Sequence, residues 1–254
     1  MTQASLLSTA HQSPTKSSRL VRFLAELLDA DVQLSHQRFI ERLGQSFDLA
    51  DSIKISAVHA KKIEATETPP EAEKDAVKDE FQRVRASIIS SAVQSFEPGA
   101  SGMRTRFPEL RAETATAETM SAEPYLAFYV AQQRNIDFRI RDLHAATRDA
   151  LTTLSPQLAR LAALDAVLAD PLLTPARRSF IVVPRLLRRR FDTLLEDLHS
   201  DNQDESNTRE RWEQSLAQFR QEMQGLLLAE IETRLLPTLG LIEALDELND
   251  NDDY

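Results

Sequence analysis

The stretch that decides the fold spans residues 208–236 and reads TRERWEQSLAQFRQEMQGLLLAEIETRLL. Its large apolar residues recur at steps of four, three, four and three, and they are Trp212, Leu216, Phe219, Met223 and Leu226. This spacing is the heptad pattern of a coiled-coil helix. A second stripe widens the apolar face towards a three-helix bundle or an oligomer, and it consists of Leu227, Ile231 and Leu235. The pattern predicts a long core helix that begins with a cap at Thr208.

Similar spacing continues towards the N-terminus of the chain. From Glu123-Pro124 to residue 169, apolar residues at steps of three and four predict long helices. Within this stretch, Pro156 either kinks one helix or starts a new one that is capped by Ser155. Prolines also predict three later boundaries, namely a helix start at Thr174-Pro175, a bend or restart at Val183-Pro184, and a short last helix after Pro237.

Four shorter helices are expected in the N-terminal part of the chain. Ser17 or Ser18 can cap the first, Ser35 the second and Asp48 the third. The fourth runs from Glu71 to about Phe96. We therefore predict an all-α fold in five parts: a disordered segment at 1–16, an N-terminal helical bundle at 17–96, a linker or mobile loop at 97–122, an elongated antiparallel coiled-coil-like bundle at 123–248, and an acidic tail at 249–254.

The composition agrees with a helical protein and excludes several kinds of site. Only 5 glycines occur among 254 residues, which disfavours tight hairpins and glycine-rich phosphate loops. The absence of cysteine excludes disulfides, thiolate nucleophiles and cysteine metal sites. No apolar run approaches the ~20 residues of a membrane span, and the first residues do not resemble a signal peptide. We expect a cytoplasmic protein.

Linear motifs for catalysis or metal binding are scarce. Glu196 and His199 have the i, i+3 spacing that presents a carboxylate and an imidazole on one helix face in di-iron bundles. Such a site needs a second copy of this motif, and none of the other histidines has a glutamate three residues before it. We therefore interpret the pair as a solvated helix end. We expect no enzyme, no cofactor and no metal, although an active site assembled only in three dimensions stays open.

One charged segment departs from the background. Between Asp170 and Asp192 no acidic residue occurs, but six arginines do: Arg177, Arg178, Arg185, Arg188, Arg189 and Arg190. On a continuous helix, Arg178, Arg185 and Arg189 would share one stripe. Guanidinium groups bind carboxylates and phosphates in a two-point geometry. Three interpretations remain open: a solvated basic face, a docking site for an acidic protein partner or for the acidic segment 246–253 of this chain, and a nucleic-acid site.

Several segments of the chain also resemble a known family. They are SRLVRFL at 18–24, FIERL at 39–43, DSI at 51–53, LARLAALDAVL at 158–168 and VPRLLRRRF at 183–191. Together they are similar to an uncharacterised proteobacterial family catalogued only as a domain of unknown function. Its members are often encoded beside membrane proteins similar to motor stators and OmpA-like peptidoglycan binders. The resemblance implies a cytosolic accessory of a membrane ion-driven complex, such as those of antiviral defence.

These observations lead to a prediction of function. We expect a non-enzymatic helical scaffold or adaptor that binds protein partners, including a membrane complex, and that can form a homo-oligomer. The alternative is a nucleic-acid-binding accessory protein that uses the arginines of 177–190. The net charge of −10 opposes this alternative, because it repels the phosphate backbone.

Overall fold

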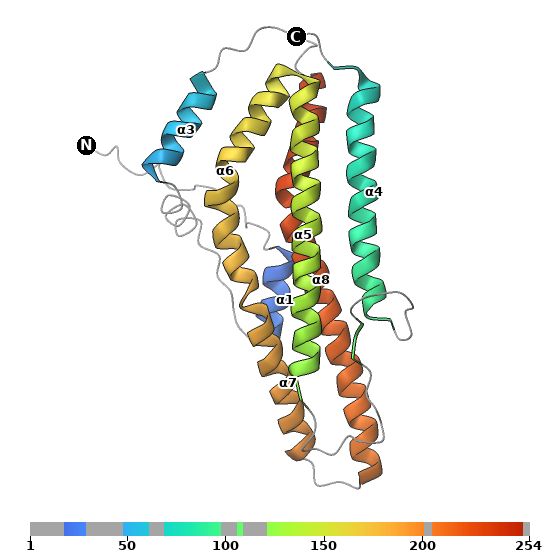
Figure 1. The fold of residues 1–254 in the computed structure, drawn as a ribbon. Coiled ribbons are helices and arrows are strands. Elements are labelled where there is room, and N and C mark those ends of the chain that lie inside the picture. The colour runs from blue at the N-terminus through green and yellow to red at the C-terminus, as the bar shows by residue number, and fades with distance from the viewer. Residues whose placement is uncertain are drawn as a thin grey trace, which may run out of the picture.

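The computed structural model describes residues 18–28, 48–60, 69–97, 106–108, 121–200 and 205–250, and every regular element in these residues is an α-helix (Figure 1). The all-α prediction is thereby confirmed. The helices are α1 (Arg19–Leu28), α3 (Leu49–Ala60), α4 (Glu71–Ser95), α5 (Glu123–Leu154), α6 (Pro156–Phe180), α7 (Val183–Ser200) and α8 (Glu205–Asp250). The longest, α8, has 46 residues and is about 69 Å long at 1.5 Å per residue.

Side-chain caps start several of these helices where the sequence predicts them. Ser18 Oγ accepts a hydrogen bond from the backbone N–H of Val21 at the start of α1. At the start of α3, Asp48 and Asp51 cap one another reciprocally, since each side chain accepts from the other's backbone N–H. This is the geometry of a capping box, which satisfies two N–H groups that have no partner within the helix.

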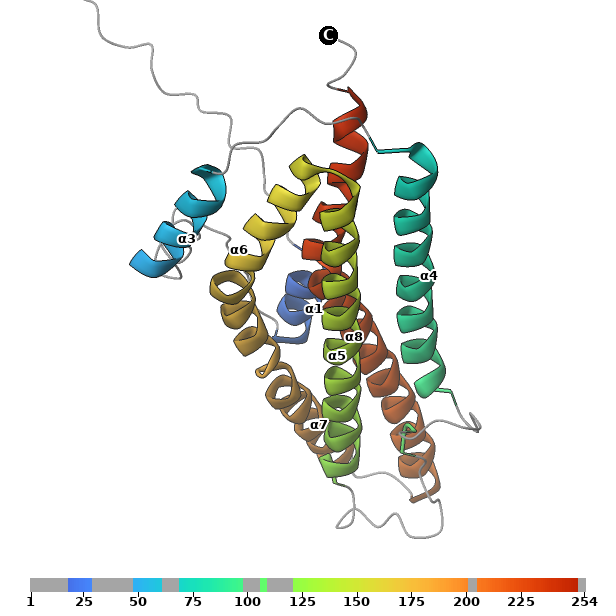
Figure 2. The same ribbon diagram turned by 45° about the horizontal axis from the view of Figure 1, so that its top comes forward.

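The boundary between α5 and α6 decides between the two interpretations of Pro156. Ser155 lies between the helices in an extended conformation, and its Oγ accepts a hydrogen bond from Leu158 N–H at 3.2 Å. Pro156 is the first residue of α6, where the missing N–H costs nothing. Ser155 therefore caps a new helix, and α6 returns antiparallel to α5 (Figure 2).

The long helices form the predicted elongated antiparallel arrangement. α5 runs in one direction, α6 and α7 run back, and α8 runs beside α5 in the same direction as α5 (Figures 1 and 2). The apolar stripe of 208–236 provides much of the core between them, since eight of its residues are buried: Trp212, Leu216, Phe219, Met223, Leu226, Leu227, Ile231 and Leu235. The sequence pattern thus identified the core face of α8.

Three predicted helix boundaries are wrong. α6 continues through Thr174-Pro175, and the chain breaks only at Ile181 and Val182 before α7. α8 continues through Pro237, and it begins at Glu205 rather than at Thr208. Proline removes one backbone hydrogen bond, but burial of an apolar face on both sides can outweigh that loss. The stripe of α8 indeed stays buried beyond Pro237, at Leu241, Ile242 and Leu245.

The described N-terminal helices pack against the long helices rather than chiefly against one another. α1 contacts α8 and α7, α3 contacts α6, and α4 contacts both α5 and α8. The bundle predicted at 17–96 stays a prediction, because residues 29–47 and 61–68 lie outside the described part of the chain. Of the described helices, α1 and α4 contribute to one core with α5–α8, whereas α3 has no buried residue. α1 and α4 are stabilised in these positions because each buries an apolar face on a long neighbour, at Leu20 in α1 and at Phe81 and Ile88 in α4.

Part of the predicted linker also belongs to this core. Phe107 N–H donates to the carbonyl of Ser95, and the Phe107 ring lies 5.4–5.6 Å from the rings of Phe96, Tyr125 and Phe128. The mobility predicted for 97–122 as a whole stays a prediction. The helix predicted from Ser35, the disordered segment 1–16 and the end of the acidic tail lie outside the described residues.

Candidate functional site

The junction of α6 and α7 is where the predicted arginine cluster meets an exposed apolar surface. α6 ends at Phe180, which is buried, and α7 begins at Val183, which is also buried. The two residues between them point outwards, since Ile181 is 63% exposed and Val182 is 44% exposed. The Val182 carbonyl accepts from the backbone N–H groups of Arg185 and Leu186, so it starts the first turn of α7.

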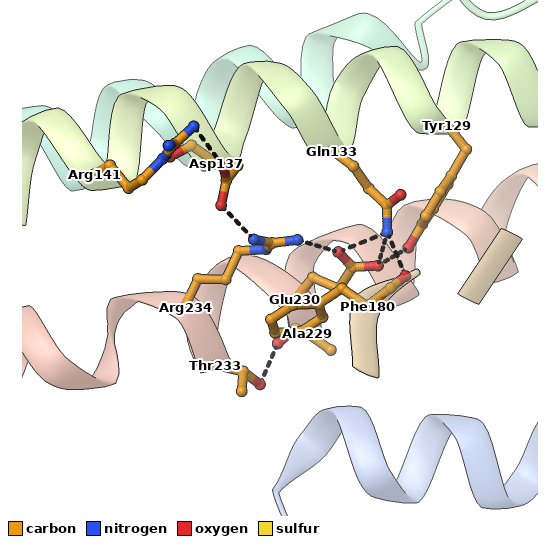
Figure 3. A network of polar contacts seen from close by, with 9 residues as sticks. All are labelled: Tyr129, Gln133, Asp137, Arg141, Phe180, Ala229, Glu230, Thr233 and Arg234. Atoms are coloured by element: carbon orange, nitrogen blue, oxygen red, sulfur yellow. Dashed lines mark hydrogen bonds and ion pairs between the residues drawn. The ribbon is translucent and has the colours of Figure 1, made fainter. Parts of the chain in front are cut away.

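Two side chains from other helices hold Phe180 in place (Figure 3). Gln133 of α5 donates from Nε2 to the Phe180 carbonyl at 3.1 Å, which satisfies a carbonyl at the end of α6. The guanidinium of Arg234 on α8 lies 3.9 Å from the centre of the Phe180 ring, a cation–π distance. The position of the junction is therefore fixed by both α5 and α8.

A buried carboxylate lies directly behind this junction. Glu230 of α8 is 0% exposed, and its oxygens accept hydrogen bonds from Tyr129 Oη at 2.7 Å and from Gln133 Nε2 at 2.8 and 3.0 Å (Figure 3). Arg234 lies 3.5 Å from Glu230 and 2.7 Å from Asp137 of α5. Arg141 extends the chain of ion pairs to the surface through Asp137 at 2.8 Å.

Burial dominates the protonation of this network. It raises the pKa of Glu230 above its ordinary value of 4.5, although the hydrogen bond from Tyr129 and the charge of Arg234 act in the opposite direction. Burial and the neighbouring charge of Glu230 raise the pKa of Tyr129 well above 10.0, so the hydroxyl keeps its proton and donates it. Both oxygens of Glu230 have donors within the protein, and the network links α5, the end of α6 and α8.

The structure separates the six arginines into different environments. Arg190 makes a two-point contact with Glu222 of α8, with both distances at 2.9 Å, and Arg188 pairs with Glu123 at the start of α5. These pairs fasten α7 to its neighbours. The side chains of Arg177 and Arg178 lie outside the described part of the chain, and the break at 181–182 removes the continuous stripe that the sequence predicted.

Arg185 and Arg189 are different, because they lie one turn apart on the exposed side of α7. Among the residues that the structure describes, neither guanidinium has an ion-pair partner. Together with the apolar pair before them, they form what we call the junction surface, defined as Ile181, Val182, Arg185 and Arg189. Such a surface combines apolar area with two positive charges that are not neutralised by described carboxylates.

The other candidate residues lie elsewhere. Glu196 and His199 are both exposed near the end of α7, and the His199 ring donates from Nδ1 to the Leu195 carbonyl. Within the described ranges no group of three or more potential metal ligands occurs. Asp246 of the predicted acidic segment pairs with Lys78 of α4 at 2.6 Å. Asp246 is 24 residues beyond Glu222, the partner of Arg190, or about 36 Å along α8, so the Asp246 carboxylate is remote from Arg190.

The polar network around Glu230 was missed by the sequence analysis. Its one local signal is a glutamate inside the apolar run Leu226-Leu227-Leu228-Ala229-Glu230-Ile231. A buried glutamate needs partners, but these are about 100 positions earlier in the chain, at Tyr129 and Gln133. No spacing rule connects residues at such a separation.

Comparison with known protein families places the chain. The chain matches the family described as "Protein of unknown function (DUF3348)" over residues 6–247. No curated protein and no solved structure matches it. In the part of the chain that the structure describes, no helix has both the length and the apolar character needed to cross a bilayer.

Proposed function

The chain belongs to this family of proteins of unknown function, which confirms the resemblance seen in its sequence, and we propose that it is a non-enzymatic helical adaptor. It binds a protein partner through the junction surface. The observation that carries this proposal is the exposed apolar pair Ile181 and Val182 beside the exposed Arg185 and Arg189. Apolar contacts supply binding free energy, and the arginines select acidic side chains around them.

The paired arginines support the choice of this surface. Arg188 and Arg190 each have a carboxylate partner on a neighbouring helix, so their charges are already paired within the chain. Arg185 and Arg189 have no comparable role among the described contacts. A protein segment with apolar residues flanked by Asp or Glu complements this arrangement.

A protein partner explains this surface better than a nucleic acid does. Two arginines contact few phosphates, and the net charge of −10 repels a polyanion. The exposed side chains of Ile181 and Val182 offer no hydrogen-bond donor to a phosphate backbone and no aromatic platform for a base. The nucleic-acid alternative remains a distinct outcome of the test below.

A finer proposal concerns the identity of the partner and rests on the family resemblance alone. The resemblance implies a cytoplasmic accessory of a membrane ion-driven complex, as in antiviral defence. The cytosolic segments of the stator-like and OmpA-like membrane proteins encoded beside the family are therefore the first partners to test. The adaptor itself needs no cofactor in this proposal.

The test reverses both charges of the junction surface. We expect Arg185→Glu combined with Arg189→Glu to weaken partner capture at least about tenfold, which is roughly 1.4 kcal/mol. Capture is measured by crosslinking in the native host and mass spectrometry, and then with the purified partner. Both side chains are exposed, so helicity by circular dichroism stays unchanged.

A matched variant controls for net charge. Arg83→Glu combined with Arg85→Glu makes the same change in net charge at two exposed positions of α4 and leaves capture intact, although it also removes the exposed ion pair between Arg83 and Glu80. Equal capture by both double variants and the wild type would refute the adaptor surface and favour a solvated face. Salt-sensitive binding of oligonucleotides at about 150 mM salt, lost only in the α7 variant, would favour the nucleic-acid alternative.

A further inference from the structure

The contact between α1 and α8 is built around a glycine. Gly225 lies inside α8, and a methyl group placed on its Cα would lie 2.7 Å from Cζ and 2.9 Å from Cε1 of Phe23. The Phe23 ring therefore occupies the space that any other side chain would take. Figures 1 and 2 show α1 lying along α8.

A glycine at this place has a cost for α8. Inside a helix, glycine is less favourable than alanine by about 1 kcal/mol. Gly225 is far from both ends of α8, so no cap or turn requires it. The contact with Phe23 gives this glycine a role, because it lets an aromatic ring approach the helix backbone closely.

Other contacts make the same surface selective for α1. Arg19 pairs with Glu232 of α8 at 2.8 Å, and its guanidinium lies 5.8 Å from the Phe23 ring. Leu20 is only 6% exposed, and Leu24 packs against the core. Anchors at this spacing are the pattern of an amphipathic helix bound in a groove.

The occupant is a short helix whose stability depends on this contact. α1 has 10 residues, fewer than the ~12–15 that an isolated helix needs for marginal stability. Among the helices that the structure describes, α1 contacts α8 and α7. α1 therefore behaves as a bound peptide, and its release costs less than global unfolding.

We propose that the groove around Gly225 on α7 and α8 is an exchangeable helix-binding site, and that α1 of a second copy of this chain can occupy it. A second copy is the partner because its α1 carries the side chains whose fit the structure demonstrates. The exchanged contacts are identical to those within one copy, which is the condition for a domain-swapped dimer. This site does not include the junction surface and does not depend on the adaptor proposal.

Tethering determines when the exchange occurs. Within one copy, α1 competes for its groove at an effective concentration in the millimolar range, so a dilute wild-type chain keeps its own α1. Exchange becomes favourable when one chain has a defective α1 and another has a defective groove. Two full-length variants create this situation: Phe23→Ala weakens α1, and Gly225→Leu fills the groove.

The decisive experiment mixes these two variants. We expect each variant alone to be monomeric by sedimentation velocity, and the equimolar mixture to approach twice the mass of one chain. In the mixture, the intact α1 of the Gly225→Leu chain enters the intact groove of the Phe23→Ala chain. A mixture that stays monomeric, with both variants folded, overturns the proposal.

A second measurement decides the question if Gly225→Leu does not fold. A fluorescein-labelled peptide of residues 17–29 is titrated into the full-length Phe23→Ala chain and followed by anisotropy. We expect saturable binding that is weakened at least tenfold by adding Glu232→Arg, which repels Arg19. Glu243→Arg is the control, because it makes the same change at another exposed position of α8 and leaves binding intact. No saturable binding, or equal binding by both charge variants, refutes the site.

Discussion

Removing the Tyr129 hydroxyl tests whether the buried network holds the helices together. Tyr129→Phe keeps the ring in the core and removes one donor, whose bond to Glu230 is 2.7 Å long. A hydrogen bond to a charged group contributes about 1.5–3 kcal/mol to the free energy of unfolding. A buried acceptor that loses one of its donors still has the cost of its removal from water. We therefore expect the free energy of unfolding to fall by about 2 kcal/mol. For a chain of this size, the melting temperature should fall by about 4–8 °C.

The assay is urea denaturation at neutral pH followed by circular dichroism, with a thermal melt as a second probe. Tyr125→Phe is the control, because Tyr125 is also buried in α5, one turn earlier, and makes no hydrogen bond with a described carboxylate. We expect this control to change stability by less than about 0.5 kcal/mol. If the network is rigid, Tyr129→Phe should shift the midpoint of the urea transition and leave the slope of the unfolding free energy against urea concentration unchanged.

A double-mutant cycle with Glu230→Gln attributes the effect to the pair. The two side chains are in contact, so we expect a coupling free energy of about 0.5–3 kcal/mol. If Tyr129→Phe and Tyr125→Phe cost the same, or if the coupling is zero, then the hydroxyl does not stabilise Glu230. The interpretation of the network as a positioning device would then be wrong.

Three further predictions follow from other contacts. Burial raises the pKa of Glu230 in the folded state above 4.5, so protonation of Glu230 favours the folded state. The free energy of unfolding of the wild type, relative to that of Glu230→Gln, should therefore increase as pH falls from neutral towards 4.5 and decrease as pH rises through the folded-state pKa. Urea titrations at several pH values check this. Ser155→Ala should destabilise the chain by about 1 kcal/mol through loss of the α6 cap, with Ser155→Asp as the rescuing variant in the same melt. Phe107→Ala should lower the free energy of unfolding, measured by urea denaturation, by about 2–4 kcal/mol, because the Phe107 ring packs against three aromatic neighbours. A change near zero would show that residues 106–108 are not part of the core.

Local signals in the sequence were sufficient for most of the fold. Helix starts at Ser18, Asp48 and Ser155 depend on a side chain and a backbone N–H only three residues away, so a reader of the sequence can find them. The apolar stripe of 208–236 likewise identified its own core face, because periodicity in a helix is a local property. Thr174-Pro175 shows the limit of such local signals, because the cap pattern predicts a helix start where the backbone of α6 continues as a helix.

Long-range partners could not be predicted in the same way. The arginines of 177–190 looked equivalent in the sequence, yet Arg190 meets Glu222 and Arg188 meets Glu123, on two different helices. Only the arrangement of α5, α7 and α8 determines which guanidinium is neutralised and which stays exposed. Among the four arginines whose side chains the structure describes, the order of the helices in space therefore leaves Arg185 and Arg189 as the unpaired candidates for partner binding.

The buried network and the exposed surface meet at the same point of the chain. Phe180 is held by Gln133 and Arg234, and the next two residues, Ile181 and Val182, begin the junction surface. A buried ion pair is seldom the most stabilising choice for a core, because desolvation offsets much of its attraction. Apolar residues at 133, 230 and 234 could fill this space, but they would leave the Phe180 carbonyl without its donor. The presence of these polar residues in the core is therefore better explained by where they hold Phe180 than by the stability they add. They fix where α6 ends and in which direction the junction surface faces.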